Sequence, residues 1–199
     1  VLEVVIIRKA LDARRKNNIS FVYSLDVKTT VPEGQLLARL KGDKDITKIE
    51  EQKPASIALG QIKLTERPVV IGFGPAGMLA ALTLAEHGYR PLVLERGRDV
   101  ETRTKDVAKF WKTGEFDETS NVQFGEGGAG TFSDGKLYSQ VKDPNHYGRK
   151  VMTEFVKAGA PEEILFVSKP HIGTYKLVTM VEKMRAEIIE LGGEVRFAT

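Results

Sequence analysis

Residues 69–77 read VVIGFGPAG, an apolar run that leads into three glycines at fixed offsets. The run predicts a strand over 69–72, and the residues after the glycine turn predict a helix over about 75–87. A strand that turns sharply into a helix through G-x-G-x-x-G is typical of dinucleotide-binding proteins. The alternative is a glycine turn in an α/β protein that binds nothing.

Each residue of the turn has a physical task in this interpretation. Gly72 permits the tight turn, Gly74 lets the backbone approach a diphosphate, and Gly77 lets the helix pack closely on the strand. Pro75 suits the first helical turn, where its missing N–H costs nothing, and Ala76 follows it. The N-terminus of the helix then offers free N–H groups and the positive end of its dipole to phosphate oxygens.

A second strand is expected over 91–95, after the helix and Gly88, which completes a right-handed βαβ unit. Glu95 ends this strand, 18 residues after Gly77. An acidic residue at this place accepts hydrogen bonds from adenosine ribose hydroxyls, and its charge disfavours the 2′-phosphate of NADP. The alternative for Glu95 is a solvated carboxylate at a strand end.

The chain is interpreted as two parts. Residues 1–66 predict a small, incomplete α+β module, with a hairpin that turns at Lys16-Asn17-Asn18. Residues 67–199 predict an incomplete Rossmann-like dinucleotide-binding domain of the α/β class, in which EVRFAT at 194–199 forms a third parallel strand; the glycine spacing leaves FAD and NAD open. Both ends of the 199-residue sequence look cut, so we expect a fragment of a longer protein.

Three further helices are expected in the second part, over 99–113, over 148–158 and from Thr174 to about Leu191. Thr174 is the expected N-cap of the last of these helices. A short helix opened by Pro161 is expected as well.

Composition excludes several function classes. The chain has no cysteine, which excludes disulfides, thiolate metal sites and redox-active thiols, so redox chemistry would need a bound cofactor. A net charge of +3 does not by itself imply nucleic acid, and the cluster of Arg14, Arg15 and Lys16 fits a solvated hairpin end better than an RNA contact. His87, His146 and His171 lack metal-ligand spacing. We expect a cytoplasmic protein without membrane spans or a metal.

A second glycine-rich stretch, FGEGGAGTFSDGKL at 124–137, carries five glycines in eleven residues. Such a stretch predicts a loop, since glycine is costly inside a helix or strand. A loop of this kind lets a flat ligand or a phosphate approach the backbone. The alternative is a flexible surface loop with solvated charges.

The segments DARRKNNISFVYSLDV, GFGPAGMLAAL, LERG and FGEGGAGTFSDGKLY together resemble uncharacterised bacterial FAD-dependent dehydrogenases of the two-dinucleotide-binding-domain type. The resemblance covers nearly the whole chain, and its proteins are much longer. It implies that residues 67–199 are an incomplete FAD-binding domain and that the parent protein is an FAD-dependent oxidoreductase, with FAD as cofactor and NAD(P)H as a candidate electron donor. The fragment alone is expected to be inactive.

The same resemblance implies roles for particular residues. It places the segment Gly127, Gly128, Ala129, Gly130 and Thr131 along FAD, and it places Ser133, Asp134 and Lys136 near the isoalloxazine ring. Arg96 and Arg103 are expected near the cofactor phosphates, with a solvated helix face as the equal alternative for Arg103.

No catalytic acid or base, substrate, electron acceptor or oligomeric state follows from the sequence. The alternatives for the whole are an NAD-only dehydrogenase domain and a non-catalytic binding module. Because the segment that closes the far side of such cofactor sites is not found, we expect the 199-residue chain to bind FAD weakly or not at all.

Overall fold

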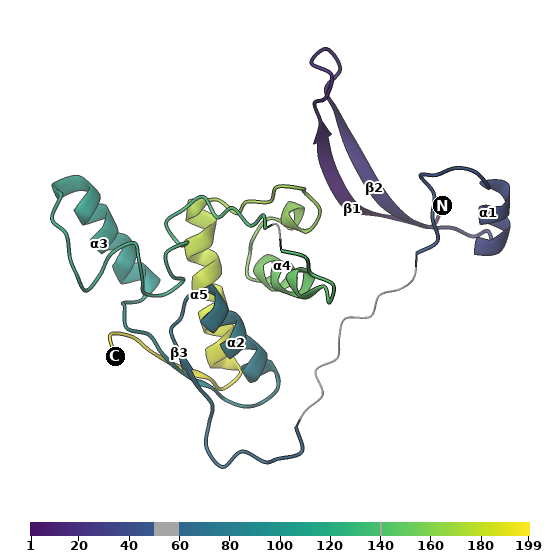
Figure 1. The fold of residues 1–199 in the computed structure, drawn as a ribbon. Helices are drawn as coiled ribbons and strands as arrows, with labels where there is room; N and C mark the ends of the chain where they lie inside the picture. The colour runs from purple at the N-terminus through teal and green to yellow at the C-terminus, as the bar shows by residue number, and fades with distance from the viewer. Residues whose placement is uncertain (50–59, 140) are drawn as a thin grey trace.

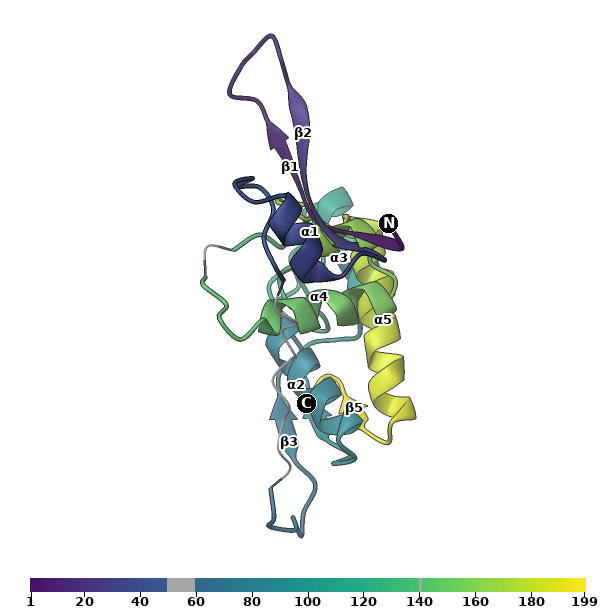
Figure 2. The same ribbon diagram turned by 90° about the vertical axis from the view of Figure 1, so that its right-hand side faces the viewer.

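A computed structural model describes residues 1–49, 60–139 and 141–199 (Figures 1 and 2). Residues 50–59 of the expected N-terminal module therefore lie outside the described residues. The described part is a mixed α/β structure, in which a three-stranded parallel sheet carries the helices of the C-terminal region.

The parallel sheet is built from β3 (Val69–Ile71), β4 (Leu92–Leu94) and β5 (Glu194–Arg196), in the order β3-β4-β5. The registers Val70↔Val93 and Val93↔Val195 place these three valines on the face that enters the core. The expected third parallel strand is therefore confirmed. All three strands are short, and the sheet is smaller than a complete doubly wound Rossmann sheet.

Helices α2 (Pro75–Glu86) and α5 (Thr174–Glu190) pack on each other and on the sheet. The buried residues of α2 are Met78, Ala81, Leu82 and Ala85, which recur at helical spacing and form one face. The two helices lie side by side in Figure 1. This packing fixes the N-terminus of α2 at the end of β3, where the glycine turn lies.

The expected N-cap of α5 is wrong by one residue. Gly173, with φ of +91°, occupies the cap position, and Thr174 is the first helical residue. The Thr174 hydroxyl donates instead to the carbonyl oxygen of Ser133 at 2.8 Å. Sequence pattern favoured the threonine because its side chain can cap, but here a contact with a distant loop uses that hydroxyl.

The remaining elements of the C-terminal region are α3 (Val100–Thr113), α4 (Tyr147–Lys157) and the short 3₁₀ helix η1 (Glu162–Leu165). Each agrees with its expected range to within a residue or two. The second glycine-rich stretch forms a loop, as expected, between α3 and α4.

The N-terminal region holds an antiparallel hairpin of β1 (Glu3–Asp12) and β2 (Ser20–Lys28), followed by α1 (Glu33–Arg39). The hairpin extends away from the helices in both views (Figures 1 and 2). Its described contact with the C-terminal region is a short parallel bridge between Lys9 and Val167. Among the described residues, no helix is long and apolar enough to cross a membrane.

Candidate dinucleotide site

The first glycine turn connects β3 to α2 with little space for side chains. Gly72 has φ of +91°, a left-handed conformation that favours glycine, and its N–H donates to the Leu94 carbonyl at 2.8 Å. A Cβ on Gly77 would lie 1.9 Å from the carbonyl oxygen of Gly72. The turn and the close approach of helix to strand therefore require glycine at both positions.

The N-terminus of α2 has no protein side chain to cap it. Gly74 is the N-cap residue, Pro75 is the first helical residue, and the first turn carries no acidic side chain. The amide groups of a first helical turn have no partner within their own helix. A helix end left in this state favours an anion, because its dipole is positive there.

Glu95 lies directly beside this turn and is 5% exposed. One carboxylate oxygen accepts from the N–H of Phe73 at 2.5 Å, and the other accepts from the N–H of Gly97 at 2.8 Å. The side chain therefore points toward the glycine turn rather than away from it. Because a carboxylate has about four acceptor sites, two N–H donors leave capacity for hydroxyl donors.

The second glycine-rich stretch packs on the first glycine turn. The N–H of Gly127 donates to the carbonyl of Phe73 at 2.9 Å. A Cβ on Gly128 would lie 3.2 Å from the Cα of Gly74 and from the Cδ of Pro75. The fold thus brings two segments about fifty residues apart into backbone contact, which no spacing rule in the sequence could show.

Arg103 does not lie on a solvated helix face, and its expected place near the cofactor phosphates stays a prediction. Its side chain is fully buried, and its guanidinium donates to the carbonyls of Glu126 and Asn121, with a longer contact of 3.3 Å to that of Gly128. Burial lowers the pKa of Arg103, while the Glu95 and Glu126 carboxylates oppose that shift. The geometry therefore favours a role in holding the glycine-rich loop from inside.

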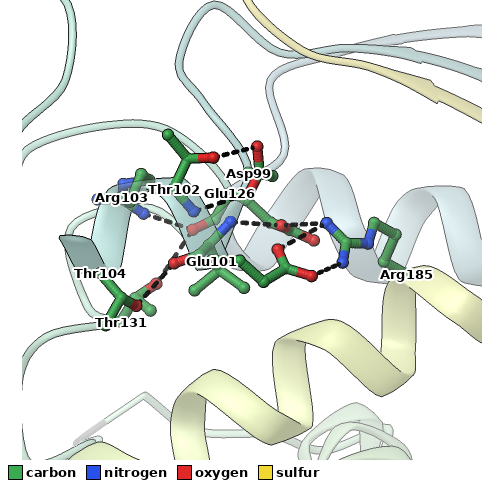
Figure 3. A network of polar contacts seen from close by, with 9 residues as sticks. Asp99, Glu101, Thr102, Arg103, Thr104, Glu126, Thr131 and Arg185 are labelled. Carbon is green, nitrogen blue, oxygen red and sulfur yellow. Dashed lines mark hydrogen bonds and ion pairs between the residues drawn. The ribbon is translucent and has the colours of Figure 1, made fainter. Parts of the chain in front are cut away.

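A buried carboxylate, Glu126, stands at the centre of this loop (Figure 3). One of its oxygens accepts from the N–H of Val100 at 2.7 Å and from Arg185 at 2.8 Å, while the other has no partner among the described residues. Burial raises the pKa of Glu126 to about 7, against the effects of the Val100 N–H and the Arg185 charge. Glu126 thereby ties the loop to the start of α3 and to α5.

Arg185 links this carboxylate to a second one. Its guanidinium contacts Glu101 as well as Glu126, so a single arginine from α5 bridges α3 and the loop (Figure 3). Nearby, Asp99 caps α3 by accepting from the N–H of Thr102 at 2.8 Å. The N-terminus of α3 is therefore satisfied by protein carboxylates.

The other predicted site residues lie around these groups. Arg96 is exposed, with its guanidinium 4.5 Å from the centre of the Phe124 ring, and it lines a shallow pocket of about 380 Å³ with Arg98 and Thr199. Ala129 and Gly130 are exposed, whereas Thr131 is buried and its hydroxyl donates to the Glu126 carbonyl at 3.3 Å. Thr131 therefore supports the loop internally.

Ser133, Asp134 and Lys136 form the far end of the loop. The Ser133 hydroxyl donates to the carbonyl of Gly130 at 2.6 Å, and Lys136 lies 3.5 Å from Asp134. Both charged side chains are exposed. Lys136 also pairs with His171 in an isolated antiparallel bridge, so the loop end is held by the segment before α5.

Two features escaped sequence reasoning, namely the buried Glu126 and the contact of Gly97 with Gly125. A Cβ on Gly97 would lie 2.3 Å from the Cα of Gly125, so two backbones cross there. The available signal for Glu126 was that a single acidic residue stands among five glycines. In a solvated loop such a residue would have no distinct role, so the signal was not used. The signal for Gly97 was its place directly after the second strand.

Comparison with known proteins finds one family model and one relative that match this chain. The model of the FAD binding domain family matches residues 67–108, which include β3, α2, β4 and the first part of α3. An uncharacterized protein from Clostridium beijerinckii is 52% identical over 192 residues, covering 96% of this chain and 35% of that protein. The chain thus spans about a third of that relative's length. The family match supports an FAD-binding domain over these residues.

Proposed function

We propose that this chain is the FAD-binding part of an FAD-dependent oxidoreductase, with the cofactor diphosphate at the N-terminus of α2. The observation that carries the proposal is the combination of an uncapped helix end with the Glu95 carboxylate beside it. The match of the FAD binding domain family to residues 67–108 supports the choice of FAD over NAD.

The residues present fit such a cofactor. Gly77 leaves no room for a side chain between the helix and the turn, and Gly74 and Pro75 add none that could fill the helix end. Glu95 retains acceptor capacity for the hydroxyls of a ribose. An adenosine diphosphate group needs both features, an anion site and an acceptor pair.

In this proposal, Gly72, Gly74 and Gly77 with Pro75 and Ala76 form the diphosphate site, and Glu95 holds the ribose. Exposed Arg96 supplies positive charge near the adenosine end. The loop residues 127–130 lie along the cofactor, supported from inside by the buried Thr131, and the exposed Ser133, Asp134 and Lys136 lie toward its ring. Bound FAD would supply the redox chemistry by accepting and donating a hydride.

Arg103 and Glu126 act on the loop in this proposal rather than on the cofactor. Arg103 donates to two loop carbonyls, counting the longer contact to Gly128, and to the Asn121 carbonyl just before the loop, while Glu126 anchors the loop to α3 and α5. Together they hold the backbone of Gly127 against the first turn. Preorganised loops of this kind reduce the ordering cost of ligand binding.

The test is to purify the Clostridium beijerinckii relative, which contains the counterpart of this chain within a longer protein, and to identify the cofactor released on denaturation. Released FAD supports the proposal. A protein that releases NAD alone, or no dinucleotide after reconstitution with FAD, would contradict it. Of the two outcomes expected from the sequence, weak binding of FAD or none, we propose weak binding for the 199-residue chain alone. The α2 end and Glu95 are both present in it, whereas the chain spans about a third of that relative.

A further inference from the structure

A second cavity, of about 550 Å³, lies where the N-terminal hairpin meets the segment between η1 and α5. The edge of β1 pairs there with residues 166–168. The N–H of Lys9 donates to the Phe166 carbonyl at 2.7 Å, and the Lys9 carbonyl accepts from the N–H and the hydroxyl of Ser168, both at 3.0 Å. Backbone hydrogen bonds between β1 and residues 166–168 therefore form part of the cavity wall, together with side chains.

The lining of this cavity includes more cationic than anionic residues. Arg8, Lys9 and Lys169 contribute three positive charges, against the single carboxylate of Glu163. Among the residues that the structure describes, none of these four side chains takes part in an ion pair. Arg8 donates a hydrogen bond from Nε to the Ser168 hydroxyl at 3.4 Å. The positive charges of Arg8, Lys9 and Lys169 are therefore not paired with a described carboxylate, which leaves them to attract an anion.

Most of the rest of the lining is apolar. Leu11 and Phe21 pair across the hairpin and are 60% and 57% exposed, and Ile164 and Val167 line the cavity as well. The Lys9 ammonium lies 4.5 Å from the centre of the Phe21 ring, so charge and apolar surface are adjacent. A ligand that suits both surfaces has one anionic group and an apolar body.

The cavity also borders the second glycine-rich loop. Pro170 and His171 line it, and the same residues pair with the loop, through the N–H of Leu137 to the Pro170 carbonyl at 2.9 Å and the Lys136–His171 bridge. A ligand in the cavity would thus lie next to the segment that the proposed function puts beside the flavin ring.

We infer that this cavity binds an organic carboxylate with an aromatic or branched apolar body, and that such a molecule is the substrate class of the flavoprotein. The pairing of three cations with an exposed apolar wall in a cavity of ligand size carries the inference. The claim that this molecule is the substrate rests on the proposed function, whereas the claim that the cavity binds it does not.

The experiment is a titration of the ¹⁵N-labelled 199-residue chain with 3-phenylpropionate, compared with the neutral 3-phenylpropanamide, followed by amide chemical shifts. We expect the carboxylate to shift amides in 8–11 and 164–171 and to bind about fivefold more tightly than the amide. Equal binding of the two compounds, or shifts confined to other segments, would overturn the inference.

A variant pair sharpens the test. The double substitution Lys9→Gln and Lys169→Gln should remove the preference for the carboxylate, whereas Lys112→Gln, an exposed lysine on α3, should leave it unchanged. An unchanged preference in the double variant would contradict the inference. Because neither compound contacts the glycine turn in this scheme, the result does not depend on whether the chain binds FAD.

Discussion

The N-termini of helices α2 and α3 differ in whether the protein itself caps them. The N-terminus of α3 is capped by Asp99, carries Glu101 in its first turn and donates a backbone N–H to Glu126. The N-terminus of α2 has glycine at the cap, proline next and no acidic residue in its first turn. One helix end is satisfied by the protein, and the other is left for an external anion.

The third residue of each helix shows whether its backbone N–H has an acceptor in the protein. In α3, the N–H of Thr102 donates to Asp99 at 2.8 Å. In α2 that position is Gly77, and Gly74 has no side chain that could accept from it. The comparison teaches that glycine at the cap does more here than permit a turn, because it also withholds the acceptor that a stable isolated helix would use.

The largest effect is expected from Gly77→Ala, which tests the close packing of the α2 end. Its Cβ would meet the Gly72 carbonyl oxygen at 1.9 Å, so the helix must move from the strand. We expect a loss of about 4 kcal/mol in the free energy of unfolding, measured by urea denaturation. Gly130→Ala, with no atom within 4 Å of the new Cβ, is the control and should change little.

Much of this architecture followed from sequence, and the reasons are local. The apolar strand, the glycine offsets and the burial of α2 at helical spacing are properties of adjacent residues, so β3, α2, β4 and β5 were expected where they are found. The burial of Arg103 was not expected, because the sequence DVETRTKDV is typical of a polar helix. Arg103 becomes buried only because the loop at 125–128 packs over it. The same long-range contact buries Glu126, which then ties the loop to α3 and α5.

The next effect concerns pH at the α3 end. The pKa of Glu126 is raised to about 7, above its ordinary value of 4.5. Between these values the unfolded chain loses this proton while the folded chain keeps it, so the contribution of Glu126 to stability falls as pH rises and levels off above 7. Relative to Glu126→Gln, we expect the wild-type chain to lose about 3 kcal/mol between pH 4.5 and 7.5.

Denaturation of both proteins across that pH range provides the measurement. The difference between them isolates Glu126 from the other carboxylates, such as Asp117 and Glu115, whose pKa values are lowered. A difference that stays constant or grows with pH would show that Glu126 is ionised in the folded chain throughout. The α2 end has no such titrating group in its first turn and should contribute no pH dependence of this kind.

A smaller effect is expected from Asp99→Ala, which removes the cap of α3 and makes its N-terminus resemble that of α2. The substitution leaves the N–H of Thr102 without its acceptor. We expect a loss of about 1 kcal/mol in stability, as for other N-cap residues, measured by thermal or urea denaturation. No loss would mean that Glu101 and Glu126 alone satisfy this helix end.

The most direct test of the central claim is a titration of the ¹⁵N-labelled chain with FAD, with FMN as the control that lacks the adenosine half. The account predicts weak binding of FAD that shifts the amides of 72–78 and 95–97, no comparable shift with FMN, and loss of the FAD effect in Gly74→Asp, which would place a carboxylate at the helix end. Equal shifts from FMN, no response of these amides to millimolar FAD, or an unchanged response in Gly74→Asp would contradict it.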